Sequence, residues 1–304
     1  MRFHINESRY FLKEWPDGSS EAEQFNLGLQ AHLLERGFPV PKLLTAIDGE
    51  KSVQWGGRKI SLYDYVGEAY DPAQGQEQRD ACATALGEFH RVTTDFPLTG
   101  SQWKSDPSFG FSESFINDAT MRLPSLLLST ASKRRVAGHL RELDTILQKA
   151  KERLSAAEWF ALPHVPIHGD FCQFNSRFKN HALVGVVDWD TARLAPRILD
   201  VAHAMNIALG WSSSIDYYED FKWQDTVVPK EREIVHWITQ YRRLAPEMTD
   251  KEVHLLPLVC AAIWPAPSSG FEPKNEQEVE NCEIAIDFMR HFMDEADAIS
   301  KAIN

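Results

Sequence analysis

Two stretches near the middle of the chain decide its fold: residues 167–175, which read IHGDFCQFN, and residues 183–190, which read LVGVVDWD. The first follows a short apolar run, the second opens with one, and such runs are typical of buried strands. Asp170 and Asn175 lie five residues apart on the loop that leaves the first strand, and Asp188 directly follows the second. If these strands pair with each other, the three side chains converge at one end of a hairpin.

These three side chains are the parts that phosphoryl transfer requires. A carboxylate and an amide oxygen are hard ligands suited to Mg²⁺, which takes its other ligands from water and from substrate phosphates. A second carboxylate can accept the proton of an attacking hydroxyl. On this chemistry we assign Asp170 as the catalytic base and Asn175 and Asp188 as the metal ligands.

The remainder of the chain divides by the period of its hydrophobic pattern. Up to residue 66 we predict a small α+β unit, with a hairpin in the first 15 residues, a helix from Ser20 to Gly37, and further strands at 43–47 and 59–65. Beyond it the periodicity predicts a mostly helical unit, interrupted only by strands at 165–167 and 182–187. Its long helices are expected at residues 76–92, 132–151, 230–243, 250–264 and 276–303.

The central motif, His-Gly-Asp-x-x-x-x-Asn followed by Val-Asp-Trp-Asp, resembles that of the aminoglycoside phosphotransferase and choline kinase-like family. Residues 25–40 also have some similarity to the homoserine kinase branch of that family. Other segments that resemble the family, in the same order along the chain, are residues 12–13, 36–41, 62–66, 86–90 and 196–202. The resemblance implies a bilobal α+β protein-kinase-like fold. It places a nucleotide-binding N-lobe at residues 1–66, and a C-lobe with the catalytic loop and the acceptor site at residues 67–304.

The resemblance also implies roles for single residues. Lys13 would bind the α and β phosphates of ATP or GTP, and the backbone of Asp64, Tyr65 and Val66 would bind the purine. Asp170 would be the base, and Asn175 and Asp188 would hold Mg²⁺. Supporting roles fall to His168, Asp190 and Asp200, of which His168 and Asp200 are expected to orient the catalytic loop by hydrogen bonds.

Two departures from the family pattern stand out. The family normally opens with a strand and a glycine-rich or Ser/Asn-rich turn over the phosphates, whereas Met1 falls where that turn should already be finished. We therefore expect an N-lobe without this first strand and turn, or a chain that begins upstream. The helix glutamate that pairs with the lysine aligns with Asn26, so either Glu23, one helical turn away, replaces it, or Lys13 lacks a partner.

Composition limits the partners. The formal net charge of −12 repels nucleic acid and anionic lipid, and we expect neither as a partner. The four cysteines are at least 22 residues apart, which argues against a paired-cysteine metal or redox site, and the first residues lack a signal-peptide pattern. No apolar run approaches the ~20 residues of a membrane span. We predict a cytoplasmic protein and leave its oligomeric state open.

Three functions remain open from the sequence. The leading hypothesis is a Mg²⁺-dependent small-molecule kinase that acts on a hydroxyl of an aminoglycoside, homoserine, choline, a sugar or a similar compound. The second is a catalytically weak or inactive relative that binds nucleotide or metabolite, which the two departures favour. The third is a metal-dependent hydrolase with His168 and Asp170 as ligands. The aromatic residues Trp211 and 217–221 could line an acceptor pocket or pack as ordinary helix surface.

Overall fold

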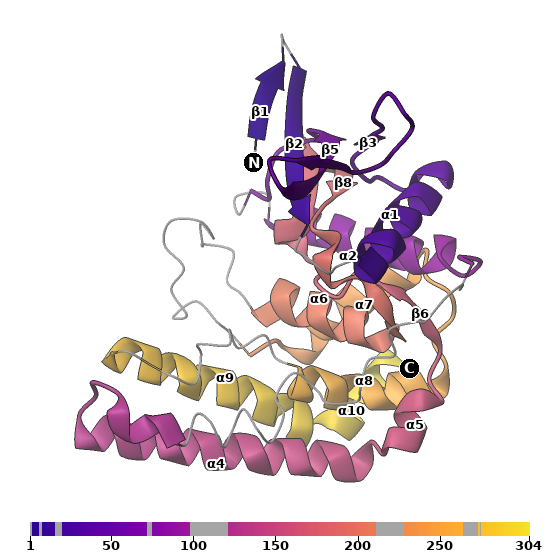
Figure 1. Cartoon of the computed structure of the whole chain (residues 1–304). Helices are drawn as coiled ribbons and strands as arrows, with labels where there is room; N and C mark the ends of the chain where they lie inside the picture. Colours follow the sequence, from indigo (N-terminus) through magenta and orange to yellow (C-terminus); the bar gives the residue numbers. More distant parts are fainter. Residues whose placement is uncertain are drawn as a thin grey trace.

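A small antiparallel sheet and one long helix, α1 (Ser20–Glu35), form one part of the molecule, and helices form most of the other (Figure 1). This computed structural model describes residues 2–5, 8–15, 20–71, 75–97, 121–210, 228–263, 273 and 275–304. The helices and strands therefore segregate along the chain as the sequence predicts. The division at residues 66 and 67 itself stays a prediction.

The sheet is built around its longest strands. Its members are β1 (Arg2–Ile5), β2 (Ser8–Trp15), β3 (Leu43–Leu44), β4 (Val53–Trp55) and β5 (Arg58–Asp64). They are ordered β1-β2-β5-β3, with β4 paired to the other end of β5. The predicted hairpin and the strand near 59–65 are present, the strand predicted at 43–47 is only two residues long, and β4 was not predicted. Opposite each other on β2 and β5 lie Lys13 and Ser61.

Helix α1 ends where the sequence predicts. Gly37 has a φ of +76°, a left-handed conformation that glycine adopts without a steric penalty. The N–H of Phe38 donates to the carbonyl of Leu33 at 2.9 Å, which satisfies a carbonyl left open at the helix end. Leu29 and Leu33 on this helix are fully buried. The turn after α1 directs the chain back to the sheet through Pro39, whose carbonyl accepts from the N–H of Val186 at 2.9 Å.

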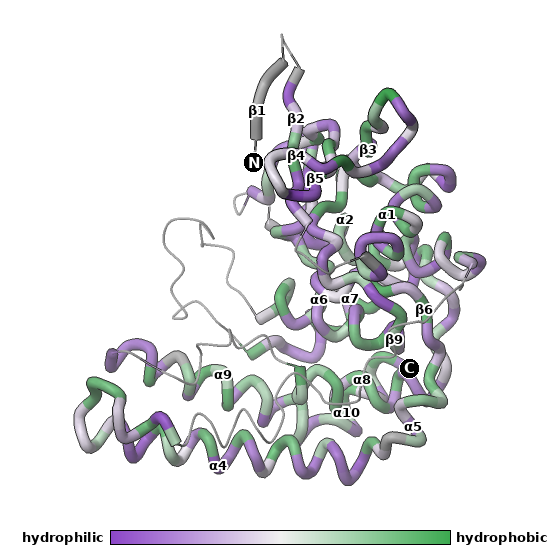
Figure 2. Tube along the Cα trace, in the orientation of Figure 1, coloured by the Kyte–Doolittle hydropathy of each residue, from purple (hydrophilic) through white to green (hydrophobic). Residues whose placement is uncertain are grey.

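The larger part is helical, with the central helices enclosed by long amphipathic ones. Its helices are α2 (Gly75–Val92), α4 (Thr130–Arg153), α5 (Ala156–Phe160), α6 (Ile198–Gly210), α7 (Glu231–Arg242), α8 (Asp250–Ala262), α9 (Glu276–Asp294) and α10 (Ala296–Ile303). The single helix predicted at 276–303 is two helices separated at Glu295. Along α4 and α9, which pack against each other, hydrophilic and hydrophobic residues alternate with a helical period (Figure 2). Within the described residues, no helix is long and apolar enough to cross a membrane.

The short β insert differs from the predicted hairpin. Its elements are β6 (His164–Ile167), β7 (Ser176–Lys179), β8 (Ala182–Val186) and β9 (Arg193–Pro196), with single 3₁₀ turns η3 (Gln173–Asn175) and η4 (Trp189–Thr191) and a further turn, η2 (Leu123–Ser125), before α4. The strands at 165–167 and 182–187 do not pair with each other: β6 pairs with β9, and β7 pairs with β8. β7 and β9 escaped prediction because each is four residues long and mixes charged with apolar side chains, so neither shows an apolar run.

Helices α2 and α7 pack with their backbones in close contact. A Cβ atom added at Gly87 would collide with the carbonyl oxygen of Tyr241 and lie 2.9 Å from the backbone nitrogen of Ala245. This approach lets His90 Nδ1 reach Tyr241 Oη at 2.9 Å in the interior. Glycine at position 87 is therefore required by the packing of the two helix backbones.

We expect Gly87→Ala to lower the free energy of unfolding by about 3 kcal/mol, because backbone must move to admit the methyl group. Gly138→Ala in α4 is the matched control, since a Cβ there meets nothing within 4 Å. That control should be neutral or stabilise by up to about 1 kcal/mol. Urea denaturation of both variants measures the difference. Equal stability of the two variants would contradict the packing argument.

Candidate active site

The loop that carries Asp170 is held by one buried carboxylate. Asp200, on α6, is fully buried and accepts the backbone N–H groups of His168 and Gly169, each at 2.7 Å. Burial alone would raise the pKa of Asp200, but the nearby ring of His90, whose Nε2 lies 3.5 Å from Oδ2, and the contacts with His168 together hold this pKa below its usual value. Asp200 therefore stays ionised and fixes the start of the loop.

Gly169 gives the loop its sharp turn. Its φ is +80°, and a Cβ there would lie 2.5 Å from Arg193 Nη1 and 2.6 Å from the carbonyl oxygen of Thr191. Only glycine meets both the left-handed conformation and the close approach without strain. The turn directs the next residue, Asp170, away from β6.

His168 joins the ends of the two apolar strands. Its side chain is fully buried, and burial lowers its pKa, which favours the neutral ring. Nε2 donates to the carbonyl of Val187 at 3.1 Å, and Nδ1 accepts the N–H of Asp170 at 3.3 Å. Both ring nitrogens are thus used within the protein. His168 is placed to orient the loop and has no nitrogen left for a metal.

Asp170, Asn175 and Asp188 are brought together even though their strands do not pair directly. Asn175 Nδ2 donates to Asp170 Oδ2 at 2.8 Å and to the Asp170 carbonyl at 2.9 Å. The N–H of Val187 donates to the Asn175 carbonyl at 2.8 Å, which brings the next residue, Asp188, to the same place. Because its amide nitrogen is used by Asp170, Asn175 has Oδ1 left to face a cation. Asp188 has a φ of +66°, and both side chains line one cavity.

Sequence analysis missed a fourth member of this group, His203. Its Nε2 lies 2.7 Å from Asp170 Oδ1, so both oxygens of Asp170 have a protein partner. Burial would raise the pKa of Asp170, but the hydrogen bond and charge of His203, with His168 and Asn175, lower it overall. A partial signal was present: His203 follows Asp200 by three residues, a spacing that returns to the same face of a helix. No helix was predicted at these residues, so this spacing was not used.

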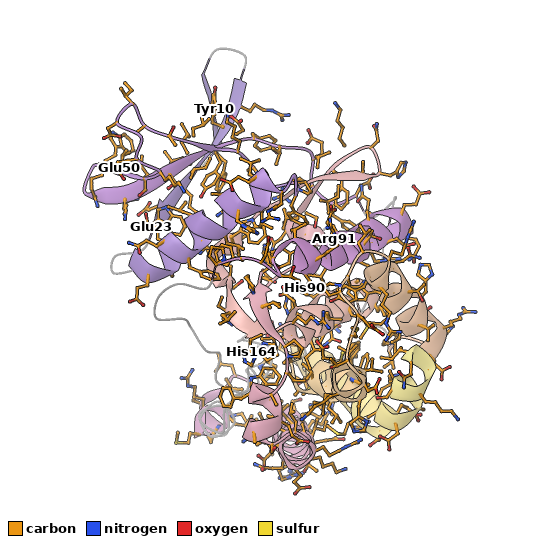
Figure 3. All side chains as sticks on the ribbon, turned by 90° about the vertical axis from the view of Figure 1, so that its right-hand side faces the viewer. Tyr10, Glu23, Glu50, His90, Arg91 and His164 are labelled. Atoms are coloured by element: carbon orange, nitrogen blue, oxygen red, sulfur yellow. The ribbon has the colours of Figure 1, made fainter. Side chains whose placement is uncertain are left out.

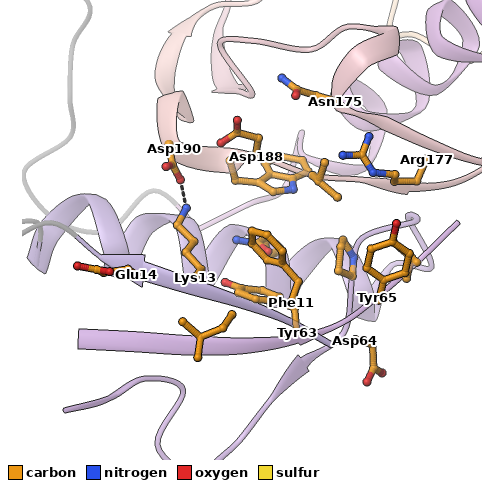
Figure 4. Close-up of a pocket in the computed structure, with 16 residues that line it drawn as sticks. Phe11, Lys13, Glu14, Tyr63, Asp64, Tyr65, Asn175, Arg177, Asp188 and Asp190 are labelled. Carbon is orange, nitrogen blue, oxygen red and sulfur yellow. Dashed lines mark ion pairs between the residues drawn. The ribbon is translucent and has the colours of Figure 1, made fainter. Parts of the chain in front are cut away.

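The cavity lies between the sheet and the β insert and has a volume of about 390 Å³ (Figure 4). It is lined by Phe11, Leu12, Lys13, Glu14, Gln30, Pro41, Tyr63, Asp64, Tyr65, Val66, Asn175, Arg177, Val187, Asp188, Trp189 and Asp190. Every residue predicted to bind nucleotide or metal is among them except Glu23. The cavity therefore contains Lys13, the 64–66 segment and both predicted metal ligands.

Lys13 is the buried cation of the cavity. Burial lowers its pKa to about 8, against the opposing effect of the Asp188 carboxylate. Its ammonium forms an ion pair with Asp190, shown as a dashed line in Figure 4, and lies 4.2 Å from the centre of the Trp15 ring. Asp190 is thus placed in direct contact with the predicted phosphate-binding lysine.

Glu23 does not take the predicted place beside Lys13. Its buried carboxylate pairs with Lys59 Nζ at 2.5 Å and accepts from Ser52 Oγ at 2.7 Å (Figure 3 labels its position on α1). The β4–β5 hairpin brings these partners to the helix. Only its second strand was predicted from the sequence, so the pairing of Lys59 with Glu23 was not expected. Asn26 is also buried, and among the described residues its Oδ1 has no hydrogen-bond partner. Neither α1 side chain replaces the missing glutamate.

Comparison with known proteins identifies the family. Residues 2–233 match the model of the phosphotransferase enzyme family, known as APH. No curated protein matches the chain. The chain belongs to this phosphotransferase family, and its predicted membership is confirmed.

Solved structures that resemble the chain agree on the fold. An aminoglycoside phosphotransferase from Alicyclobacillus acidocaldarius superposes with a TM-score of 0.69 at 15% identity, over 99% of this chain and 92% of the other. A microcompartment-associated aminopropanol kinase gives 0.61 at 15% identity, with 99% and 89% covered. A spectinomycin phosphotransferase, solved with ADP and spectinomycin, gives 0.58 at 15% identity, with 98% and 88% covered. The predicted kinase-like fold is confirmed. The family match also confirms the prediction of a phosphotransferase that acts on an alcohol group of small molecules.

We expect Asp200→Asn to lower the free energy of unfolding at pH 7 by about 3 kcal/mol, because an amide cannot accept both N–H groups as an ion does. The folded-state pKa of Asp200 lies below its usual 3.8. Its stabilisation is therefore complete well above pH 3.8 and is lost as the pH falls through the lowered value.

Chemical denaturation between pH 3 and 7 tests this prediction. The variant should have a flatter stability curve on the acid side than the wild type. Asp297→Asn is the control, since Asp297 is 82% exposed and its pair with Arg153 is worth at most about 1 kcal/mol. An Asp200→Asn variant as stable as the control at pH 7 would contradict the anchoring role.

Proposed function

We propose that this phosphotransferase moves the γ-phosphoryl group of ATP or GTP to a hydroxyl of a small metabolite or antibiotic, with Asp170 as base. The observation that carries the proposal is the meeting of Asp170 with Asn175 and Asp188, two residues that line a cavity together with Lys13. A proton acceptor, two oxygen ligands and a buried cation are the parts that phosphoryl transfer needs.

The residues that line the cavity fit a nucleotide with a divalent cation. Asn175 Oδ1 and the Asp188 carboxylate would hold the cation, which would neutralise negative charge on the phosphates when bound. No group of three or more His, Cys, Asp or Glu side chains among the described residues could hold a metal ion by itself. A site with two protein ligands therefore agrees with a cation that completes its coordination with phosphates and water. Lys13 would bind phosphate in exchange for Asp190.

The segment that follows β5 supports binding of a purine. The N–H of Asp64 donates to the Lys42 carbonyl at 2.9 Å, and that of Tyr65 donates to the Arg9 carbonyl at 3.2 Å. For the N–H of Val66 the described part of the chain provides no such acceptor, although Val66 lines the cavity. This free donor at the cavity edge suits a ring nitrogen of a base. Residues 1–66 would thus supply most of the nucleotide contacts, and residues 67–304 the base and the acceptor site.

The side chains of this chain would carry out the transfer as follows. Asp170 accepts the proton of the acceptor hydroxyl while the oxygen of that hydroxyl attacks the γ-phosphorus. The bond between the γ-phosphorus and the bridging β-phosphate oxygen breaks, and the nucleoside diphosphate leaves. His203 and Asn175 hold the two oxygens of Asp170, so the carboxylate is oriented before the acceptor arrives. Asp200 and His168 keep the loop in place by their backbone hydrogen bonds.

The second candidate is a weak or inactive member of the fold that binds nucleotide. It is favoured by the ion pair between Lys13 and Asp190, which leaves the lysine without a partner on α1. The hydrolase hypothesis loses its main support, because both ring nitrogens of His168 are already used within the protein. Binding of nucleotide without turnover is thus the outcome that competes with the proposed kinase.

The acceptor belongs to the class of small alcohols, and a screen of candidate alcohols for nucleotide consumption would identify it. An amino alcohol, homoserine, choline, an aminoglycoside and a sugar form the panel. The acidic chain and the amine-bearing acceptors named for similar structures support beginning with cationic alcohols. The aromatic residues Trp211 and 217–221, considered for an acceptor pocket, lie outside the described residues. A cytoplasmic location is retained as part of the proposal.

We expect nucleotide consumption with at least one acceptor of this panel, and we expect Asp170→Asn to reduce kcat by about 10²–10⁴-fold. The nucleotide should bind the variant as it binds the wild type, because Asp170 does not line the cavity. Coupled detection of ADP or GDP, with calorimetric titration of the nucleotide, measures both quantities. Asp297→Asn serves as the active control.

Two outcomes of this experiment are decisive. Full turnover by Asp170→Asn would remove the base assignment. A wild type that binds Mg²⁺-nucleotide but consumes none with any acceptor would favour the second candidate. Removal of Mg²⁺ with EDTA should abolish turnover, and addition of Mg²⁺ should restore it.

We expect His203→Ala to lower kcat by about tenfold with the nucleotide KM unchanged, because the loss of one charge-assisted hydrogen bond frees the Asp170 carboxylate to rotate. His203→Gln can still donate to Asp170 and should recover part of the rate. Steady-state kinetics of both variants give the split between kcat and KM. A rise in acceptor KM alone would instead place His203 in the acceptor site.

A further inference from the structure

Arg177 lines the cavity beside the 64–66 segment, and neither the motif nor the proposed chemistry uses it (Figure 4). It is on β7, opposite Gly185 of β8. Two hydrogen bonds between Glu68 and Phe178, at 2.7 and 2.8 Å, join the chain just after this segment to β7. A Cβ atom added at Gly67 would lie 3.0 Å from Arg177 Cβ, so the two backbones are in close contact. These contacts fix the base of the Arg177 side chain at the end of the cavity that the 64–66 segment lines, here called the hinge end.

The guanidinium of Arg177 is held by neutral groups. Its Nη1 donates to the carbonyls of Phe174 and Ser176 at 2.9 and 3.0 Å. No carboxylate in the described part of the chain forms an ion pair with it, whereas Lys13 in the same cavity is paired with Asp190. Two backbone carbonyls, and no carboxylate among the described residues, therefore restrain its planar group. This differs from a flexible surface arginine that pairs with the nearest acid.

The opposite wall of the cavity is aromatic. Phe11 projects from β2 on the side of the sheet, and Arg177 comes from β7 on the other side, with Tyr65 near the same end (Figure 4). Lys13, Asp188 and Asp190 lie at the far end, where the phosphates of a nucleotide would be bound. A planar ligand group that enters at the hinge end would thus lie between an aromatic ring and a guanidinium.

We propose that Arg177 forms the floor of the nucleobase site and stacks its guanidinium against the face of the bound purine. A planar, delocalised cation stacks favourably on an aromatic ring, and Phe11 would cover the opposite face. The side chain would recognise the base itself, and the phosphates would depend on Lys13 and the metal ligands. This inference rests on the proposed function, because it requires that the cavity binds a nucleotide.

The test compares two ligands that share the base and differ in phosphate. Calorimetric titrations of the full chain with adenosine and with Mg²⁺-ATP give two dissociation constants for each variant. Arg177→Met removes the planar cation and keeps an apolar stem of similar length. Arg177→Gln keeps a donor for the Phe174 or Ser176 carbonyl and loses the charge, so it serves if the methionine variant does not fold. Thermal unfolding of each variant verifies the fold.

We expect Arg177→Met and Arg177→Gln to weaken adenosine and Mg²⁺-ATP by the same factor, about three- to tenfold. Arg177→Lys, which keeps the charge but not the plane, should lie between them and the wild type. Unchanged adenosine affinity in a folded variant would overturn the proposal, as would a loss confined to Mg²⁺-ATP, which would make Arg177 a phosphate ligand. If the wild type binds only the guanine ligands, guanosine and Mg²⁺-GTP take the place of adenosine and Mg²⁺-ATP in the same comparison. A wild type that binds neither Mg²⁺-ATP nor Mg²⁺-GTP would overturn the proposed function as well, and this result is distinct because it precedes any substitution.

Discussion

The active centre depends on the ionised, fully buried Asp200 and the two backbone N–H groups it accepts. Those N–H groups belong to a tight turn, and without Asp200 they would have no hydrogen-bond partner in the interior. Each unpaired N–H group would cost about 1–3 kcal/mol of folding free energy. The neighbouring residues are positioned by contacts with this turn. The turn sets the direction of Asp170, and the His168 ring contacts the backbone just after β8. Asn175 is held beside Asp170 because its side-chain amide donates to the Asp170 carboxylate. Asp200 therefore helps to position residues of the cavity although it does not line the cavity itself.

Much of this arrangement could be predicted because its signals are local. The spacing of Asp170 and Asn175 places both on one short loop, and an apolar run ending at Asp188 places that carboxylate at a strand end. The division into a sheet-bearing part and a helical part follows from a change of period near residue 66. Lys13, the 64–66 segment, Asn175 and Asp188 were predicted to form one site. The structure places all of them among the sixteen residues that line one cavity.

The failures come from contacts between segments distant in the sequence. β6 pairs with β9 and not with the strand before Asp188, because β7 and β9 are too short and too mixed in polarity to be recognised. Glu23 is paired with Lys59, which the unpredicted β4–β5 hairpin brings to α1. His203 touches Asp170 across 33 residues of sequence. A spacing rule can locate a side chain on a helix face, but it cannot tell which distant carboxylate that face will meet.

The pairing of Glu23 also bears on how the cleft can open. In kinases where a helix glutamate holds the phosphate-binding lysine, a shift of that helix separates the two and switches the enzyme off. Here the helix carboxylate is buried against Lys59 of β5, so moving α1 alone would strip a buried anion of its cation, which is a costly change. Helix and sheet are therefore expected to travel as one rigid body. An outward swing of α1 alone would separate this pair, whereas rotation of α1 and the sheet together about the segment after β5 would keep it intact.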